Sequence, residues 1–444
     1  MQPKSDKSVL FNICYIEAFE RFAYLGFSIV FTLYLIDVFH INKGIAGTYS
    51  AAFGASIYLF GMIGAYLGNF FLGSKRCVFY GLLFLYSGYL FLLLEEVSYT
   101  IIALMFLLLG SSLIKTNITA LLAKYYSINT QYAFSLFYVF VNIGCFLGVL
   151  LIGYISQVLS YLFAFILAAI SMLICILIYF KADKNLDNEE LSFAFIKDYK
   201  TYILLAFIAF ACTFDIFIIS QIISVLAICT PIFIYIGIYK KSENKANYKK
   251  FAILCLCAIF FFMLIFQCFN TLSILSRDKI DANYFNIQIP STTYISAMFF
   301  TGIIFGGFFS NLVKKYNINN YILISLSMMV AAFVFIFIAF LSKQNSINPI
   351  IFLIIYMLLG MGNVVFGAIG LDLSTKLSDE KYKTSSLGLW FLCSAAAQGI
   401  EGIIVKYYDK FSSEVYFGTQ GFFVFLCAVI ILVFSKKLSK GYKC

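Results

Sequence analysis

The residues of this sequence with the clearest chemical potential are charges that lie inside an apolar run. Glu17, Glu20 and Arg21 occur in the stretch YIEAFERFAYLG, whose surroundings are long and apolar enough to enter a bilayer. A charge at the bilayer centre costs roughly 2.5–3.5 kcal/mol, so three of them in one helix require partners or a water-filled cavity. On a helix, Glu17 shares a face with both of the others. Arg21 can therefore neutralise one carboxylate while the other stays available to take a proton.

Lys115, in GSSLIKTNITALL, is a second positive charge inside an apolar run. If it faces the same cavity, the four charged side chains sum to zero with both acids ionised, and to one positive charge when one acid is protonated. The protonated site then prefers a substrate with an anionic group such as a carboxylate, which couples proton binding to substrate binding. Two structural alternatives stay open. The cluster could only fix helix packing, or Lys115 could extend to the headgroups.

The composition indicates which elements must position these charges. The chain is 62% hydrophobic and 12% charged, with a mean hydropathy of +0.95, which is typical of a polytopic α-helical membrane protein.

We expect no cleavable leader after the polar start MQPKSDK. The cysteines form no CxxC motif and His40 is the single histidine, so neither a metal site nor a catalytic triad is predicted. Because GxSxG and HExxH are also absent, we expect neither an enzyme nor a cofactor.

Apolar runs of about 20 residues predict fourteen membrane spans. With the N-terminus inside, alternate loops receive 23 lysines and arginines on one side and 6 on the other, which places both termini in the cytoplasm. The net charge of +10 then reflects topology and anionic lipid, and no nucleic-acid partner is expected. The predicted spans are 9–36, 47–72, 77–94, 99–123, 133–156, 160–180, 201–218, 221–239, 251–275, 291–313, 319–342, 349–377, 384–405 and 415–435.

The distribution of loops predicts three parts. An N-terminal six-helix bundle covers residues 1–181, cytoplasmic loops and a central two-helix hairpin cover 182–250, and a C-terminal six-helix bundle covers 251–444. GAYLGNFFLGSKR (64–76) is similar to GGFFSNLVKKY (306–316), at corresponding places in the two bundles. Parallel repeats of this kind are typical of transporters whose substrate site lies between the two halves.

Several motifs in order along the chain now indicate a family. EAFERFAYLG resembles the ExxERFxYYG signature of the proton-dependent oligopeptide transporters, the POT or PTR branch of the major facilitator superfamily. The stretch around Lys115 resembles the fourth-helix motif of that family, although Thr116 stands where proline is usual. FYVFVNIGCFLG resembles the fifth-helix FYxxINxG signature, and LGLWFLCSAAAQ resembles the eleventh-helix GxWFL stretch. The likeness extends over nearly the whole chain.

The resemblance implies a major facilitator fold and alternating-access, proton-coupled uptake of di- and tripeptides. It implies a monomer in the plasma membrane, for which a bacterial inner membrane fits best, with the proton gradient as energy source and no cofactor. The partners are then a small-molecule substrate, protons and membrane lipid. Carried over by position, the resemblance assigns proton coupling to Glu17, Glu20, Arg21 and Lys115. It implies that the substrate-binding residues are Arg21, Tyr24, Tyr58, Lys115, Asn142, Gln267, Asn363, Trp390 and Ser394.

The C-terminal half departs from the family pattern. Asn363 stands where a glutamate normally receives the peptide ammonium, and Phe266 also replaces a usual glutamate. Because desolvating an ammonium without a counter-charge is costly, ordinary dipeptide binding should be weakened. A second hypothesis on the same fold is therefore a transporter of a non-peptide solute, such as an amino acid, nitrate or another anion. Glu401 could compensate for the lost acid, or pair with Lys406 at the membrane interface.

Overall fold

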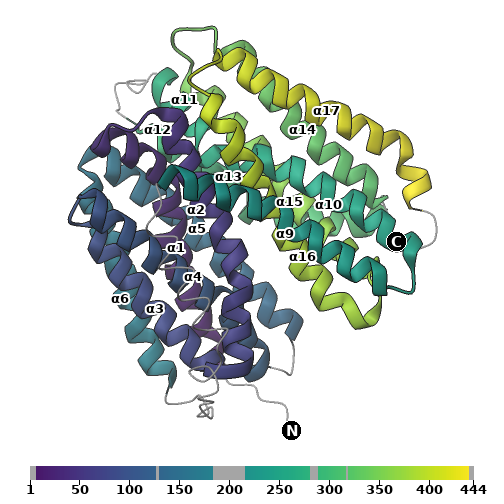
Figure 1. Cartoon of the computed structure of the whole chain (residues 1–444), viewed down its shortest axis with the longest axis horizontal. Helices are drawn as coiled ribbons and strands as arrows, with labels where there is room; N and C mark the ends of the chain where they lie inside the picture. Colours follow the sequence, from purple (N-terminus) through teal and green to yellow (C-terminus); the bar gives the residue numbers. More distant parts are fainter. Residues whose placement is uncertain (1–6, 127–129, 184–215, 281–288, 317–318, 440–444) are drawn as a thin grey trace. The chain divides into compact units, whose positions relative to one another are not determined.

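Helices account for nearly all of the structure. The computed structural model describes residues 7–126, 130–183, 216–280, 289–316 and 319–439 (Figure 1). Eleven helical segments are long and apolar enough to cross a membrane. Within the described ranges no strand forms, and Ile280 and Ile347 make only an isolated parallel bridge. These findings confirm the predicted all-α membrane fold.

The predicted spans correspond to these segments with three exceptions. Helix α3 (Ser74–Leu92) begins with two basic residues, and the apolar part of the tenth predicted span, Ser291–Gly306, is short, so neither meets the same criterion. Both are nevertheless helical where they were predicted. The seventh predicted span, 201–218, lies almost entirely outside the described residues.

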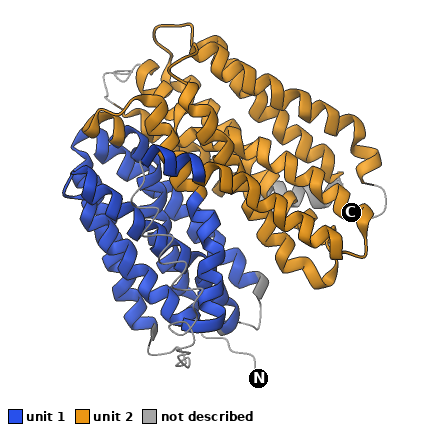
Figure 2. Cartoon of the chain, viewed as in Figure 1, with its two compact units in different colours: residues 1–34, 56–222 blue, residues 35–55, 223–444 orange. Residues whose placement is uncertain are grey.

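The chain divides into two compact units, which are coloured separately in Figure 2. Unit 1 comprises residues 1–34 and 56–222, and unit 2 comprises residues 35–55 and 223–444. Helices α1 and α2 are each divided between the units, since their adjoining ends, residues 35–55, belong to unit 2. The predicted division at residues 181 and 250 stays a prediction.

Unit 1 is held together by a buried aromatic cluster. The Phe27 and Phe31 rings stack with centroids 4.9 Å apart, and Tyr34 meets Phe165 edge-on at 5.0 Å. This cluster joins α1 to α6 one to four turns beyond the charged residues of α1. The elements that contribute to unit 1 are α1 (Lys7–Phe39), α2 (Lys43–Leu67), the π-helical turn η1 (Gly68–Leu72), α3 (Ser74–Leu92), α4 (Val97–Tyr125), α5 (Thr130–Val158) and α6 (Tyr161–Asp183).

Unit 2 contains the remaining helices, except that residues 216–222 of α9 belong to unit 1, and polar N-caps set several of their starts. Asn319 and Asn348 each accept a hydrogen bond from the backbone N–H two residues later, and Pro349 follows directly at the first helical position. The elements are α9 (Ile216–Lys241), α10 (Lys245–Phe266), η2 (Gln267–Phe269), α11 (Thr271–Lys279), α12 (Ser291–Tyr294), α13 (Ser296–Tyr316), α14 (Asn320–Leu341), α15 (Pro349–Lys376), η4 (Glu380–Tyr382), α16 (Lys383–Ile404), η5 (Val405–Tyr407) and α17 (Ser413–Leu438).

The outer faces of these helices are apolar. Helices α14 and α17 pack along each other in unit 2 (Figure 1). Each also exposes large apolar side chains, among them Phe333, Phe340, Ile430 and Val433. Such a surface suits contact with lipid, because apolar side chains need no polar partner and the backbone groups in the middle of a helix are hydrogen-bonded within it.

Candidate functional site

The charged residues of α1 form one compact cluster in unit 1. Arg21 Nε lies 2.9 Å from Glu17 Oε1 and 2.7 Å from Glu20 Oε2. The sequence suggested that Arg21 would satisfy one carboxylate, but in the structure it contacts both. The Glu20 side chain is completely buried. Within the described residues, Glu17 Oε2 and Glu20 Oε1 have no hydrogen-bond partner. Two acids therefore share one cation, and each retains an oxygen that can hold a proton.

Lys115 belongs to the same charged group. Its ammonium lies 3.6 Å from the centroid of the Tyr58 ring, so α4 and α2 meet in a cation–π contact. It makes no ion pair with any described residue, but its charge and that of Glu20 act on one another. The ammonium is held against a ring instead of extending to a headgroup. The cluster thus contains two acids, one buried guanidinium and one ammonium that no carboxylate neutralises directly.

A close crossing of α1 and α5 sets the position of this cluster. A Cβ atom at Gly144 would come within 2.1 Å of the Ala18 carbonyl oxygen, and one at Gly148 within 2.1 Å of the Phe22 carbonyl oxygen. Only glycine allows two backbones to approach so closely, as in small-xxx-small helix pairs. Gly144 was recognised from the family motif. Gly148 was missed, although its four-residue spacing from Gly144 is a signal that the sequence carries.

Of the other predicted residues of unit 1, Tyr24 lies beside the cluster, since the Arg21 Cζ atom is 5.5 Å from its ring centroid. The Asn142 side chain donates to the Tyr138 carbonyl of its own helix at 2.9 Å. Asn117 donates to the Gly64 carbonyl at 3.0 Å and so ties α4 to α2 beside Lys115. Asn117 therefore supports the site.

The predicted residues of unit 2 differ in their burial and in the side chains they contact. Trp390 is buried and stacks on Phe366, with the ring centroids 5.9 Å apart and the planes at 21°. Ser394 lies one turn further along α16 and is also buried, whereas Asn363 on α15 is half-buried. Gln267 is wholly buried at the end of α10, where its amide contacts Gln420 and Thr271. Its role as a substrate contact stays a prediction.

Glu401 does not form the ion pair with Lys406 that was considered from the sequence. Its Oε1 accepts a hydrogen bond of 2.7 Å from Asn270 Nδ2, and the residue is 1% exposed. Lys406 forms no ion pair with it, since the lysine ammonium lies over the Tyr407 ring instead. Of the two alternatives, the pairing with Lys406 at the interface is therefore wrong. A carboxylate so deeply buried is also poorly placed to receive a substrate ammonium.

Within the described ranges, no three His, Cys, Asp or Glu side chains gather as metal ligands would.

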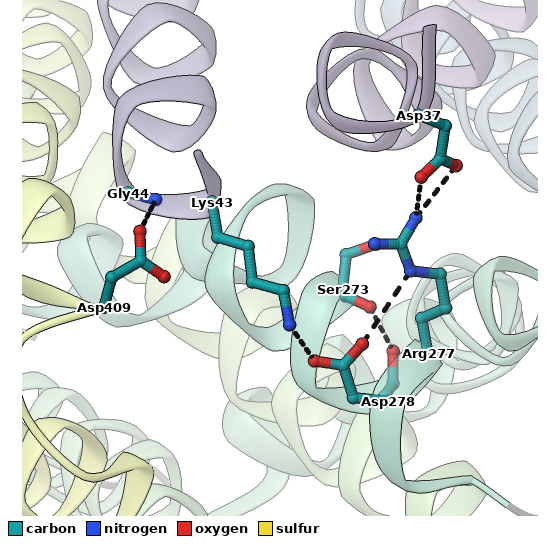
Figure 3. Close-up of polar contacts among 8 residues, drawn as sticks. Asp37, Lys43, Gly44, Ser273, Arg277, Asp278 and Asp409 are labelled. Atoms are coloured by element: carbon teal, nitrogen blue, oxygen red, sulfur yellow. Dashed lines mark hydrogen bonds and ion pairs between the residues drawn. The ribbon is translucent and has the colours of Figure 1, made fainter. Parts of the chain in front are cut away.

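A set of polar contacts joins the ends of α1 and α2 to the rest of unit 2 (Figure 3). We call these the α1–α2 end contacts. Arg277 Nη1 donates to both carboxylate oxygens of Asp37, at 2.7 and 2.9 Å. From the sequence, Lys43 and Arg277 count only as loop charges. Both belong to the six lysines and arginines in the loops of the less basic side, and this rarity is a signal that could have drawn attention to them. The two remaining contacts are Lys43 Nζ to Asp278 Oδ2 at 2.5 Å and Gly44 N to Asp409 Oδ2 at 2.7 Å.

Comparison with known proteins agrees with these features. The Major Facilitator Superfamily model matches residues 14–400. The chain is 24% identical to the uncharacterised transporter YclF of Bacillus subtilis (strain 168), over 98% of this chain and 94% of the relative. It is also 24% identical to the dipeptide and tripeptide permease B of Aliivibrio fischeri (strain MJ11), over 99% and 95%.

Among solved structures, the peptide transporter POT in complex with sulfate superimposes with a TM-score of 0.92 at 22% identity, covering 100% of this chain and 98% of that one. These similarities confirm the resemblance found from the sequence motifs. The match extends over most of the chain and the helices form the expected membrane fold, so the chain belongs to the Major Facilitator Superfamily.

Proposed function

We propose that this protein is a proton-coupled symporter that imports di- and tripeptides, or related small carboxylate-bearing solutes, by alternating access. The observation that carries the proposal is the sharing of Arg21 between Glu17 and Glu20, beside an ammonium at Lys115 that no carboxylate neutralises directly. The permease names of the relatives support the substrate class.

The chemistry follows from the charges. With both acids ionised the four side chains sum to zero, and the cluster has little attraction for an anion. Protonation of Glu20, the more deeply buried of the two acids, leaves one excess positive charge, which favours a substrate carboxylate beside Lys115. Because binding linkage is reciprocal, the bound carboxylate in turn favours the protonated acid. Proton and substrate then enter together and leave together.

The same proposal includes the setting of the protein. We infer a multi-pass monomer in the plasma membrane of a bacterium, with both termini in the cytoplasm, from the charge difference of the loops and the bacterial relatives. The proton gradient drives transport and no cofactor takes part. On this topology the α1–α2 end contacts lie on the outer side.

The experiment that tests the proposal uses proteoliposomes that contain a pH-sensitive dye and hold an inside-negative potential. A mixed dipeptide pool is added, followed in separate trials by amino acids and by nitrate. Acidification of the lumen with dipeptides is the expected result. A lack of response to every solute, with the protein folded and correctly inserted, would contradict the proposed function.

A second candidate is a transporter of a non-peptide anionic solute on the same fold. It is favoured by one observation, which is that the predicted substrate contacts of unit 2, Gln267, Asn363, Trp390 and Ser394, include no acid. Glu401 is poorly placed to supply the missing charge, because its carboxylate is buried against Asn270. A response to nitrate or amino acids without a response to dipeptides would favour this candidate.

A further inference from the structure

The inference concerns Glu401, a buried acid that the proposed transport cycle does not use. It lies in the last turn of α16, with 1% of its surface exposed. One carboxylate oxygen accepts from Asn270, and the other, Oε2, has no hydrogen-bond partner in the described part of the chain. Glu17 and Glu20 contact Arg21, whereas no cation among the described residues contacts Glu401.

The surroundings of Glu401 favour its neutral form. Among the described residues, the titratable groups that interact with Glu401 are the Cys268 thiol on η2 and the Tyr416 phenol on α17, and neither supplies a positive charge. The segments of α2 and α9 packed against α16 near Glu401 contribute Ala51, Ser224 and Ala227, which do not titrate. An ionised carboxylate without a partner in such a place costs several kcal/mol, whereas a carboxylic acid does not. A proton on Oε2 removes this cost.

The partner of Glu401 lies at a break in a helix. Helix α10 ends at Phe266, and Asn270 follows the single turn of η2 with backbone angles of φ −125° and ψ −102°, outside the helical region. The short helix α11 starts directly afterwards and carries Arg277 and Asp278 near its other end. The hydrogen bond to Glu401 therefore fixes the beginning of the helix that makes two of the α1–α2 end contacts.

The same end of α16 also packs on the beginning of α2. Thr48 Oγ1 lies 3.2 Å from the Gly402 carbonyl oxygen, and a Cβ atom at Gly47 would meet Val405 Cγ2 at 2.5 Å. Helix α16 thus contacts α2 directly, and through Glu401 and Asn270 it contacts α11. Since Asp278 of α11 pairs with Lys43 of α2, these contacts form a closed ring that passes through Glu401.

We propose that Glu401 is a second proton-binding site, separate from Glu17 and Glu20, and that its neutral form holds the α1–α2 end contacts in place. Loss of the proton leaves an unpaired charge in the ring, which is relieved when α11 and α16 separate enough to admit water. The α1–α2 end then opens. The inference rests on the proposed function only in taking the proton as the coupling ion.

The first test detects the proton directly. Infrared difference spectra of the wild-type protein in lipid, recorded as the pH is raised, should show loss of the carbonyl band of a protonated carboxylic acid. That band should be absent from Glu401→Gln and retained in Glu20→Gln. A spectrum of Glu401→Gln with every wild-type acid band still present would overturn the proposal.

The second test follows the α1–α2 end by hydrogen–deuterium exchange of residues 40–47, where the Gly44 N–H is bound to Asp409. In the wild type, protection corrected for intrinsic exchange should fall by up to about tenfold per pH unit above the pKa of Glu401. Glu401→Gln, which cannot ionise, should stay protected throughout. Glu414→Gln removes a half-exposed acid of α17 that pairs with Lys343, and should behave as the wild type.

These outcomes separate the two proposals. Equal, pH-independent protection in the wild type and Glu401→Gln would overturn the inference, even if dipeptides drive proton uptake. The predicted difference in protection would support it even if no tested solute is transported. If Glu401→Gln does not fold, the wild-type measurements decide, because a wild type without pH-dependent protection contradicts the inference alone.

Discussion

The Lys115 ammonium lies 3.6 Å from the centroid of the Tyr58 ring, and the two side chains come from α4 and α2 of the same unit. The ring stabilises the cation without neutralising it, because a π face carries no net charge. A carboxylate of an incoming solute can therefore still pair with Lys115. The contact explains how a lysine is kept inside the unit in a form that can bind an anion.

The first prediction follows from this contact. Tyr58→Leu should weaken binding of a carboxylate-bearing ligand by roughly 2- to 30-fold, the range for loss of a cation–π contact. Tyr58→Phe keeps the ring and should bind nearly as the wild type does. Lys115→Ala should weaken binding further, and its effect should disappear with a ligand whose carboxylate is amidated. Calorimetric titration measures each affinity, and an unchanged affinity in Lys115→Ala would remove Lys115 from the site.

The second prediction concerns proton coupling at Glu20. Glu20→Gln should abolish accumulation driven by a proton gradient but leave exchange of substrate across the membrane, because only the titratable group is lost. Uptake with an imposed gradient and counterflow without one measure the two activities. Asp372→Asn provides a matched control, since that acid is half-exposed and pairs with Lys376 in unit 2. Gradient-driven accumulation by Glu20→Gln would exclude the coupling role.

The third prediction tests the crossing of α1 and α5. Gly144→Ala should destabilise the protein by about 1–3 kcal/mol, because the added methyl group would overlap the Ala18 carbonyl and force the helices apart. Gly61→Ala is the matched control, since nothing lies within 4 Å of a Cβ atom there. Thermal unfolding in detergent should show a lower Tm for Gly144→Ala alone. An equal Tm for both variants would contradict the described packing.

These residues also show which features of the structure could be predicted from the sequence. The three charges of α1 are visible because hydropathy and helix spacing are local properties, and the spacing correctly predicted that Glu17 and Arg21 would meet. Contacts between distant segments could not be predicted in this way. Nothing local to Asn270 or Glu401 indicates that they bond across 131 positions, and Asp37 with Arg277 is a similar case. Gly148 is an intermediate case. Its four-residue spacing from Gly144 can be seen in the sequence, but the helix that packs against it cannot.

The last prediction concerns substrate choice at Asn363. This residue is half-buried on α15 and, by the family resemblance, occupies the position at which an acid receives the peptide ammonium. Asn363→Glu should therefore strengthen binding of a dipeptide relative to its analogue without the amino group. A new charge pair of this kind is worth on the order of 1–3 kcal/mol, or roughly 5- to 150-fold in affinity.

The design of this experiment separates a charge effect from a change of shape. Asn363→Gln lengthens the side chain as glutamate does but adds no charge, so it should leave the ratio of the two affinities unchanged. If Asn363→Glu also leaves the ratio unchanged, Asn363 does not face the ammonium, and the argument for a weakened peptide site fails. If the ratio of the two affinities rises only in Asn363→Glu, the missing acid at this position is what weakens dipeptide binding, because the two variants differ in charge and not in length.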